Sequence, residues 1–211
     1  LRSHFGFLNW WPGETKTEVV VGAILTQNTA WKNVEKAIKR LKEKGLLSEE
    51  KIANSSLKEI EEAIKPSGFY KQKAYRLRNL FKYIKDKYGS LDSFFNKSKD
   101  ELREELLSLN GIGKETADSI ILYAAEKPTF VIDAYTKRIM SRIYGINDDI
   151  NYDELKSYFE KSLKPELDLY KDFHEQFVEL AKNYCKKEPL CTQCPIRGIC
   201  LYGSKKIKIA R

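Results

Sequence analysis

The sequence lacks several features that define whole classes of protein. No run of 18 consecutive apolar residues occurs, so the sequence predicts no membrane-spanning helix. The first residues do not have the pattern of a secretory signal, and there is no low-complexity segment or internal repeat. Met140 is the only methionine, so Leu1 is not an initiator residue and we expect native residues to precede it. In the 211 residues that are present, 42% are apolar, which is sufficient for an ordinary core.

Alternating apolar and polar residues, the pattern of a β-strand, are nearly absent as well. Apolar residues recur instead at helical spacing along residues 31–41 and 77–84. Residues 19–25 are apolar nearly all round, which predicts a helix buried inside a bundle. A serine followed three residues later by a glutamate marks two helix starts, Ser56 with Glu59 and Ser98 with Glu101. The sequence therefore predicts an all-α fold.

The chain carries an excess of positive charge. It has 38 Lys and Arg against 30 Asp and Glu, a net charge of +8. Such an excess favours a polyanionic partner. The alternative is a Lys-rich and Glu-rich surface of the kind common in heat-stable proteins, and charge alone does not decide between the two.

All four cysteines lie within sixteen residues near the end of the chain, in the pattern C-x5-C-x2-C-x5-C, as Cys185, Cys191, Cys194 and Cys200. A chain of this length does not need disulfides for stability, so the spacing favours a metal site. Zinc sites usually have two close pairs of cysteines separated by a longer loop, whereas here one central C-x2-C lies between two wider gaps. The spacing therefore favours a [4Fe-4S] cluster, with zinc as the alternative.

Residues 109–117, LNGIGKETA, connect two amphipathic helical stretches and have the signature of a helix-hairpin-helix motif. Glycines in this turn let backbone amides approach a DNA phosphate, and the dipole of the following helix favours the negative charge. We expect the contacts to come from Gly111, Gly113, Lys114 and Thr116. They would hold the protein on double-stranded DNA without reading its sequence. A plain helix–helix turn is the alternative.

Asp133 follows residues 129–132, TFVI, and directly precedes a helical stretch. Its simplest role is that of a helix N-cap. Yet a hairpin, an aspartate at this distance and a four-cysteine tail together resemble the helix-hairpin-helix DNA glycosylases of the endonuclease III superfamily, over essentially the whole chain. The resemblance implies that Asp133 is catalytic, either by stabilising the sugar cation as the base leaves or by activating water. Capping and catalysis can coexist in one carboxylate.

The resemblance also implies a domain organisation. Residues 16–127 would form a six-helix domain, and residues 1–15 with 128–211 a second helical domain that carries the cluster loop, 185–200. The active site would lie between them, with Glu115 facing Asp133. The cluster would be structural. Like its relatives, the protein would act as a monomer, and with no membrane segment we expect it in the cytoplasm with the nucleoid.

Glu115 bears on the type of reaction. Members of the superfamily that also cut the DNA strand have a lysine at this place, because an amine must attack the sugar to form a Schiff base. Lys114 is adjacent, but one helical step rotates a side chain by about 100 degrees. The resemblance therefore predicts a monofunctional glycosylase that uses water. The alternative role for Glu115 is a favourable interaction with the helix dipole.

Two further residues match the part of these enzymes that opens the DNA. Gln27 matches the glutamine that fills the space left by the flipped base, and Phe69 matches the apolar wedge. Both roles make physical sense, because unstacking a base costs a few kcal/mol. The alternatives are a buried Gln cap and a core Phe.

The tryptophans indicate which base is removed. Trp10 and Trp11 precede Pro12, and with Trp31 they resemble the base pocket of the bacterial 3-methyladenine DNA glycosylases of the third class, which also have a glutamate at the place of Glu115. An aromatic sandwich favours a cationic methylated base. Some relatives have a modified active-site lysine late in the chain, and here the nearest match is Lys182. Ordinary core packing is the alternative for the tryptophans.

Two departures from the resemblance leave other functions open. Members of the alkylpurine class can lack the cluster, and endonuclease III has six residues rather than five in the first cysteine gap. One alternative is therefore an endonuclease III-like glycosylase and lyase acting on oxidised pyrimidines or mismatched thymine. Another is a DNA-binding module without catalysis, against which the presence of Asp133 counts.

Overall fold

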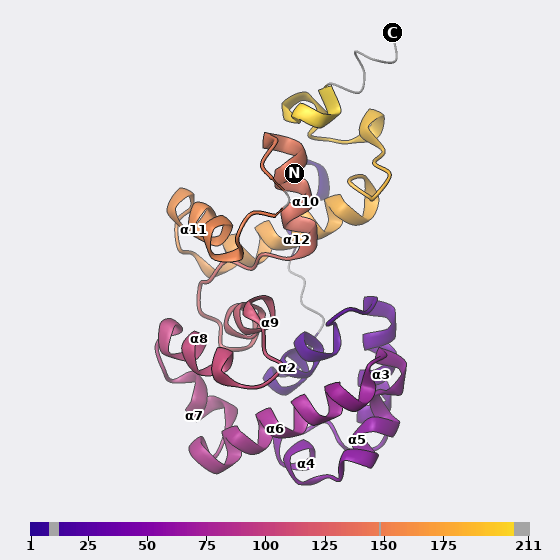
Figure 1. The fold of residues 1–211 in the computed structure, drawn as a ribbon, viewed down its shortest axis with the longest axis vertical. Coiled ribbons are helices and arrows are strands. Elements are labelled where there is room, and N and C mark those ends of the chain that lie inside the picture. Colours follow the sequence, from indigo (N-terminus) through magenta and orange to yellow (C-terminus); the bar gives the residue numbers. More distant parts are fainter. Residues whose placement is uncertain (9–12, 148, 205–211) are drawn as a thin grey trace. The chain divides into compact units, whose positions relative to one another are not determined.

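The computed structural model of the protein describes residues 1–8, 13–147 and 149–204. All regular secondary structure in these ranges is helical, and they contain no strand, so the predicted all-α fold is confirmed (Figure 1). None of the helices in these ranges is both long and apolar enough to cross a bilayer.

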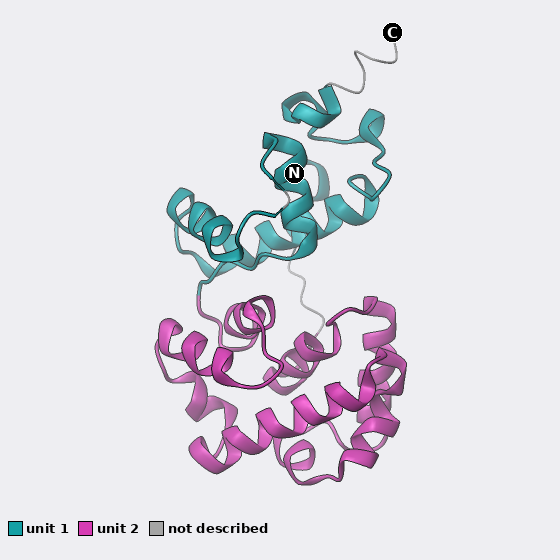
Figure 2. Cartoon of the chain, in the orientation of Figure 1, with its two compact units in different colours: residues 1–10, 128–211 teal, residues 11–127 magenta. Residues whose placement is uncertain are grey.

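The chain divides into two compact units (Figure 2). Unit 1 combines residues 1–10 with residues 128–211, and unit 2 comprises residues 11–127. The α-helices described in unit 2 are α2 (Lys16–Leu25), α3 (Trp31–Glu43), α4 (Glu49–Asn54), α5 (Leu57–Ile64), α6 (Tyr70–Tyr88), α7 (Leu91–Phe95), α8 (Lys99–Ser108) and α9 (Lys114–Ser119). A short 3-10 helix, η1 (Lys65–Ser67), precedes α6, and α9 continues into a π-helical turn, η2 (Ile120–Ala124). The resemblance implied six helices here, whereas the described residues form eight α-helical segments, three of them at most six residues long.

Helix α2 lies at the centre of unit 2, where it packs against α3, α6 and η2. Every residue from Thr17 to Leu25 is buried, which confirms the central helix predicted from residues 19–25. The long helix α6 covers α4 and α5 (Figure 1). Both predicted capping boxes are present and begin α5 and α8. They fix where these helices start because each satisfies two amides that have no partner within the helix.

Unit 1 is built on helix α12 (Leu167–Asn183), which packs against α10 (Ala134–Tyr144). Helix α11 (Tyr152–Ser162) contributes Phe159, which stacks on Phe130 with ring centroids 4.1 Å apart. The short first helix, α1 (Arg2–Phe5), and the residues after it are held on α12, because Asp172 accepts a hydrogen bond from the backbone of Leu8. The core of this unit is thus an aromatic cluster beside a helix with buried polar residues.

Candidate functional site

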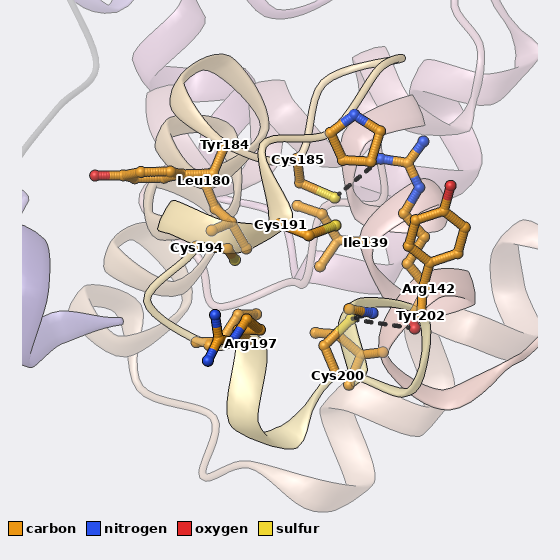
Figure 3. Close-up of a pocket in the computed structure, with 14 residues that line it drawn as sticks. Ile139, Arg142, Leu180, Tyr184, Cys185, Cys191, Cys194, Arg197, Cys200 and Tyr202 are labelled. Atoms are coloured by element: carbon orange, nitrogen blue, oxygen red, sulfur yellow. Dashed lines mark hydrogen bonds between the residues drawn. The ribbon is translucent and has the colours of Figure 1, made fainter. Parts of the chain in front are cut away.

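The four cysteines line one pocket in unit 1 (Figure 3). Cys185 comes just after α12, and the other three lie in a loop with two short 3-10 helices, η3 (Cys191–Gln193) and η4 (Arg197–Ile199). All four are half-buried and none forms a disulfide. The pocket has apolar walls from α10 and α12, supplied by Ile139, Ile143 and Leu180. The structure thus brings together all four side chains that the spacing grouped.

Arg142 of α10 holds the cysteine loop in place. Its guanidinium donates hydrogen bonds to the backbone carbonyls of Lys186 (2.6 Å) and Lys187 (3.0 Å) and to Sγ of Cys185 (3.3 Å). The backbone N–H of Gly203 lies 3.4 Å from Sγ of Cys200. N–H donors directed at sulfur are a usual feature of thiolate-bound metal groups, whose properties they tune.

Burial raises the pKa of the Cys194 thiol, and the three other cysteines raise it further as neighbouring negative charges. A group that supplies positive charge would offset this repulsion between thiolates. Within the described ranges no three His, Cys, Asp or Glu side chains form a site for a single metal ion. The all-cysteine donor set, the apolar walls and the N–H donors fit an iron–sulfur cluster.

Asp133 is the N-cap of α10. Its Oδ1 accepts hydrogen bonds from the backbone N–H and the hydroxyl of Thr136, at 2.6 and 2.8 Å. Burial opposes ionisation of this carboxyl, but the contacts with His174 and Thr136 outweigh it and hold the pKa of Asp133 below its usual value. The carboxylate is therefore charged at neutral pH, and its Oδ2 takes no part in the cap.

Oδ2 of Asp133 faces His174 of α12, whose Nε2 lies 3.7 Å away. Among the contacts that lower the pKa of Asp133, the one with His174 has the largest effect. His174 could not be predicted from the sequence, because no motif surrounds it and only the fold brings it to Asp133. Its one distinguishing signal is rarity, since the chain has two histidines.

The helix-hairpin-helix segment consists of α8, a turn and α9 in unit 2. Gly111 has a positive φ of 85°, and a Cβ at this position would lie 2.2 Å from Nε of Arg76, so only glycine fits. Gly113 has φ −90° and open space around it. The two glycines of the motif therefore have different reasons to be there. The side chain of Asp118 in α9 forms a two-pronged ion pair with Arg103 in α8, at 2.9 and 3.4 Å, and joins the two helices.

Glu115 is exposed in the first turn of α9, and Lys114 beside it is half-buried. Glu115 belongs to unit 2 and Asp133 to unit 1, and their facing each other stays a prediction. The hydroxyl of Thr116 is turned inward: it is buried and accepts a hydrogen bond from Nε2 of Gln27 at 2.9 Å. We therefore expect Thr116 to contact DNA through its backbone amide and not through its hydroxyl.

Gln27 lies in the turn after α2 and is bound on both sides. Its Oε1 accepts a hydrogen bond from Arg76 at 2.5 Å, and its Nε2 also donates to the carbonyl of Gly111 at 3.2 Å. The structure therefore links Gln27 directly to the hairpin, although the two are more than 80 residues apart in the sequence. Entry of this side chain into DNA would require these bonds to exchange.

Phe69 has two unusual properties. Its side chain is 65% exposed, and its backbone has a positive φ of 45°. A bulky aromatic residue rarely adopts this conformation, and strain of this kind is concentrated at functional sites. The alternative role considered for Phe69, that of a core residue, is excluded because its side chain is exposed.

The base-pocket residues are only partly described. Trp10, Trp11 and Pro12 lie outside the described residues. Trp31 is half-buried at the start of α3 and borders an open pocket together with three glutamates, Glu14, Glu18 and Glu35.

Lys182 is exposed on α12, with its Nζ 3.1 Å from Glu179. It comes eight residues after His174, and a rise of about 1.5 Å per residue separates the two by roughly 12 Å. Its place in the base pocket stays a prediction.

Comparison with known proteins agrees with this geometry. The family of HhH-GPD superfamily base excision DNA repair proteins matches residues 21–165. The chain belongs to this superfamily. It is 53% identical to the protein MJ1434 of Methanocaldococcus jannaschii, named as a DNA repair glycosylase, over 95% of this chain and 92% of the relative. Endonuclease III of Thermotoga maritima is 30% identical over 90% of this chain and 84% of the relative.

Among solved structures, the 3-methyladenine DNA glycosylase MagIII of H. pylori bound to 1,N6-ethenoadenine is 34% identical to this member of the HhH-GPD superfamily. The match has a TM-score of 0.72 and covers 82% of this chain and 87% of that one. The resemblance to helix-hairpin-helix DNA glycosylases found in the sequence is therefore confirmed. Membership also confirms that the protein belongs to the enzymes of base excision repair, which act on DNA.

Proposed function

We propose that the protein is a monofunctional DNA glycosylase that removes alkylated purines similar to 3-methyladenine from duplex DNA. The observation that carries the proposal is the ionised, half-enclosed carboxylate of Asp133, with Oδ2 left outside the helix cap, in a chain that has Glu115 at the place of the lyase lysine. The similarity to the 3-methyladenine glycosylase MagIII supports the choice of base.

The reaction needs little acid catalysis because an N3-methylated adenine is already cationic. The glycosidic C–N bond breaks, the base leaves as a neutral molecule with the bonding electrons, and the sugar becomes an oxocarbenium ion. The Asp133 carboxylate stabilises this cation electrostatically, and water then adds to the sugar carbon and gives up a proton to the carboxylate or to solvent. A carboxylate in a site with little water stabilises a nearby cation more strongly than a carboxylate at the surface, because water weakens the attraction between charges.

The base would be held by Trp31 and by Trp10, Trp11 and Pro12, since an aromatic face attracts a cationic ring by about 0.5 to 2 kcal/mol. The carboxylates of Glu14, Glu18 and Glu35 beside Trp31 would favour the same positive charge, although Lys42 lies 2.9 to 3.0 Å from two of them and reduces this effect. Gly111, Gly113, Lys114 and the amide of Thr116 would hold a phosphate.

Cys185, Cys191, Cys194 and Cys200 would hold the [4Fe-4S] cluster. When bound, the cluster supplies a rigid cross-link between α12 and the terminal loop and no step of base removal. The protein would work as a monomer in the cytoplasm.

The test uses duplexes that contain one N-methylated purine, thymine glycol or mismatched thymine, with base release and strand scission scored separately. Asp133→Asn is a suitable variant because asparagine also caps helices well, so the fold stays intact while the charge is lost. We expect release of methylated adenine without scission, reduced by about 100-fold or more in Asp133→Asn. Full activity of this variant would refute the role of Asp133.

A second candidate, an endonuclease III-like glycosylase and lyase, is favoured by the similarity to Endonuclease III of Thermotoga maritima. It predicts scission at thymine glycol and a protein–DNA adduct trapped by borohydride, with Lys114 as the amine. Lys114→Gln should abolish the adduct under this candidate. Under the first proposal no adduct forms with or without Lys114, and the variant should only weaken DNA binding. Glu115→Gln should lower base release if Glu115 lies at the active site, and change only stability, by about 0.3 to 1 kcal/mol, if it serves the helix dipole.

A further inference from the structure

Lys73 is a lysine buried inside unit 2, with 1% of its surface exposed. Its ammonium donates hydrogen bonds to the carbonyls of Leu25 and Ser67, each at 2.8 Å. Leu25 is the last residue of α2, and Ser67 is the last residue of η1. One cation therefore joins the ends of two elements that are about forty residues apart in the sequence. The turn after the first carries Gln27, and the turn after the second carries Phe69.

The two acceptors suit a cation. Carbonyls in the last turn of a helix lack partners within the helix, and the helix dipole is negative there. Burial, together with the charge of nearby Arg76, lowers the pKa of Lys73 to about 8, so the side chain is still mostly protonated at neutral pH. An apolar side chain of the same shape often stabilises a core as well as a buried charge does. Packing alone therefore does not account for a lysine here.

Lys73 also fixes the turn at Phe69 through its backbone. Its N–H donates to the carbonyl of Phe69 at 3.1 Å, the first hydrogen bond of α6. The turn needs such support, because Gly68 and Phe69 both have positive φ, 66° and 45°, and a bulky residue in this conformation costs roughly 1 to 2 kcal/mol. Lys73 therefore holds this turn at two points, through its backbone N–H and through its ammonium bond to the Ser67 carbonyl.

Helix α6 contacts the Gln27 turn through a second residue, Arg76, which lies on the same face as Lys73. Phe69, Lys73 and Arg76 are spaced at i, i+4 and i+7, so they lie along one face of the helix start. Arg76 binds Oε1 of Gln27 and lies against Gly111 of the hairpin. The N-terminal part of α6 is thus the common support of the Phe69 turn, the Gln27 turn and the hairpin.

We propose that Lys73 is a positioning residue that fixes the Gln27 turn and the Phe69 turn relative to each other, so that both side chains enter the duplex together. The inference rests on the proposed glycosylase function and on the roles in DNA that the resemblance implies for Gln27 and Phe69. Lys73 itself touches neither the base nor the sugar. Its charge holds the spacing of the two groups that replace the flipped base.

The experiment measures how fast the Gln27 and Phe69 side chains enter a duplex from which no base can be released. The probe is a duplex with a tetrahydrofuran abasic site, which has no base to release, and with 2-aminopurine beside it, whose fluorescence rises when its stacking is lost. The variants are Lys73→Met, which keeps the length and loses the charge, and Lys71→Met, which removes the same charge from an exposed position of the same helix. Stopped-flow fluorescence gives the insertion rate, and anisotropy gives the affinity for DNA.

We expect Lys73→Met to bind DNA as Lys71→Met does but to insert about 10- to 100-fold more slowly, since small displacements of positioned groups have effects of this size. Insertion by folded Lys73→Met at the rate of Lys71→Met would overturn this inference alone. Absence of a signal from the unaltered protein would overturn the proposed roles of Gln27 and Phe69, and this inference with them.

A second measurement covers the case in which Lys73→Met does not fold. Gln27→Ala, Phe69→Ala and the double variant are compared in the otherwise unaltered chain. If the two side chains enter as one unit, each single variant should slow insertion nearly as much as the double variant does. Independent effects, in which the two fold-changes multiply, would overturn the proposal.

Discussion

The two glycines of the hairpin should respond to the same substitution in opposite ways. In Gly111→Ala the new Cβ would lie 2.2 Å from Nε and 2.5 Å from Cδ of Arg76, and the residue would have to keep a φ of 85°. The positive φ costs roughly 1 to 2 kcal/mol and the crowding about 1 to 3 kcal/mol, so we expect a loss of about 2 to 5 kcal/mol of unfolding free energy. In a chain of this size that lowers Tm by about 4 to 20 °C.

Gly113→Ala is the matched control for stability and the test variant for DNA binding. Its φ of −90° suits alanine, and nothing lies within 4 Å of the added methyl group. We expect a stability loss under about 1 kcal/mol, the usual cost of a poorer N-cap. If a phosphate approaches the amides here, however, the methyl group would weaken one or two hydrogen bonds, about 1 to 2 kcal/mol or roughly 5- to 30-fold in Kd.

The assays are urea unfolding followed by circular dichroism, and fluorescence anisotropy with the tetrahydrofuran duplex at two salt concentrations. We expect Gly111→Ala to lose stability, and Gly113→Ala to keep its stability but to bind DNA more weakly. Equal destabilisation by the two variants, or a Gly111→Ala protein as stable as the wild type, would refute the steric argument. Normal DNA binding by Gly113→Ala would refute the phosphate contact.

Three further predictions concern the ion pairs and the cysteines. Asp118→Ala removes the two-pronged partner of Arg103 and should lower the unfolding free energy in urea by about 2 to 4 kcal/mol, and a loss below about 0.5 kcal/mol would contradict this. Because the pKa of Asp133 is lowered by folding, the stability that its charge adds is present above its unfolded value of about 4 and is lost as pH falls through the lower folded value. The stability difference between the wild type and Asp133→Asn should therefore shrink below about pH 4, and a difference that is constant from pH 7 to 2 would count against the shift. Cys194→Ser should reduce iron and sulfide content per chain, with Thr192→Ser in the same loop as the control, and iron-free protein in both the wild type and the control would exclude the cluster.

Much of the local structure follows from the sequence because its determinants are local. The capping pairs at Ser56 and Ser98 satisfy amides within four residues, so they mark helix starts in any context. The residues of α2 are apolar all round, which leaves the interior as their only stable place. The four cysteines could be grouped because their short spacing along the chain is typical of four-cysteine metal sites.

The tertiary contacts of the candidate functional residues could not be predicted from the sequence. The sequence treated Gly111 and Gly113 as equivalent, yet the side chain of Arg76 distinguishes them. It gave no sign of His174 beside Asp133 or of Lys73 between Leu25 and Ser67. It matched Lys182 to the base pocket only by its place late in the chain, and its ion pair with Glu179 appears only in the structure.

The sequence by itself determined the all-α class, the helix-hairpin-helix motif, the four-cysteine site and the superfamily, because each depends on periodicity or on short spacing. Only the tertiary structure decided which side chains share an environment. The exposed and strained Phe69, the inward-turned Thr116 and the lowered pKa of Asp133 depend on neighbours that come from distant parts of the chain. The physical reason is that pKa values, burial and ion pairs depend on distances in space between residues. These distances are set only when the chain folds.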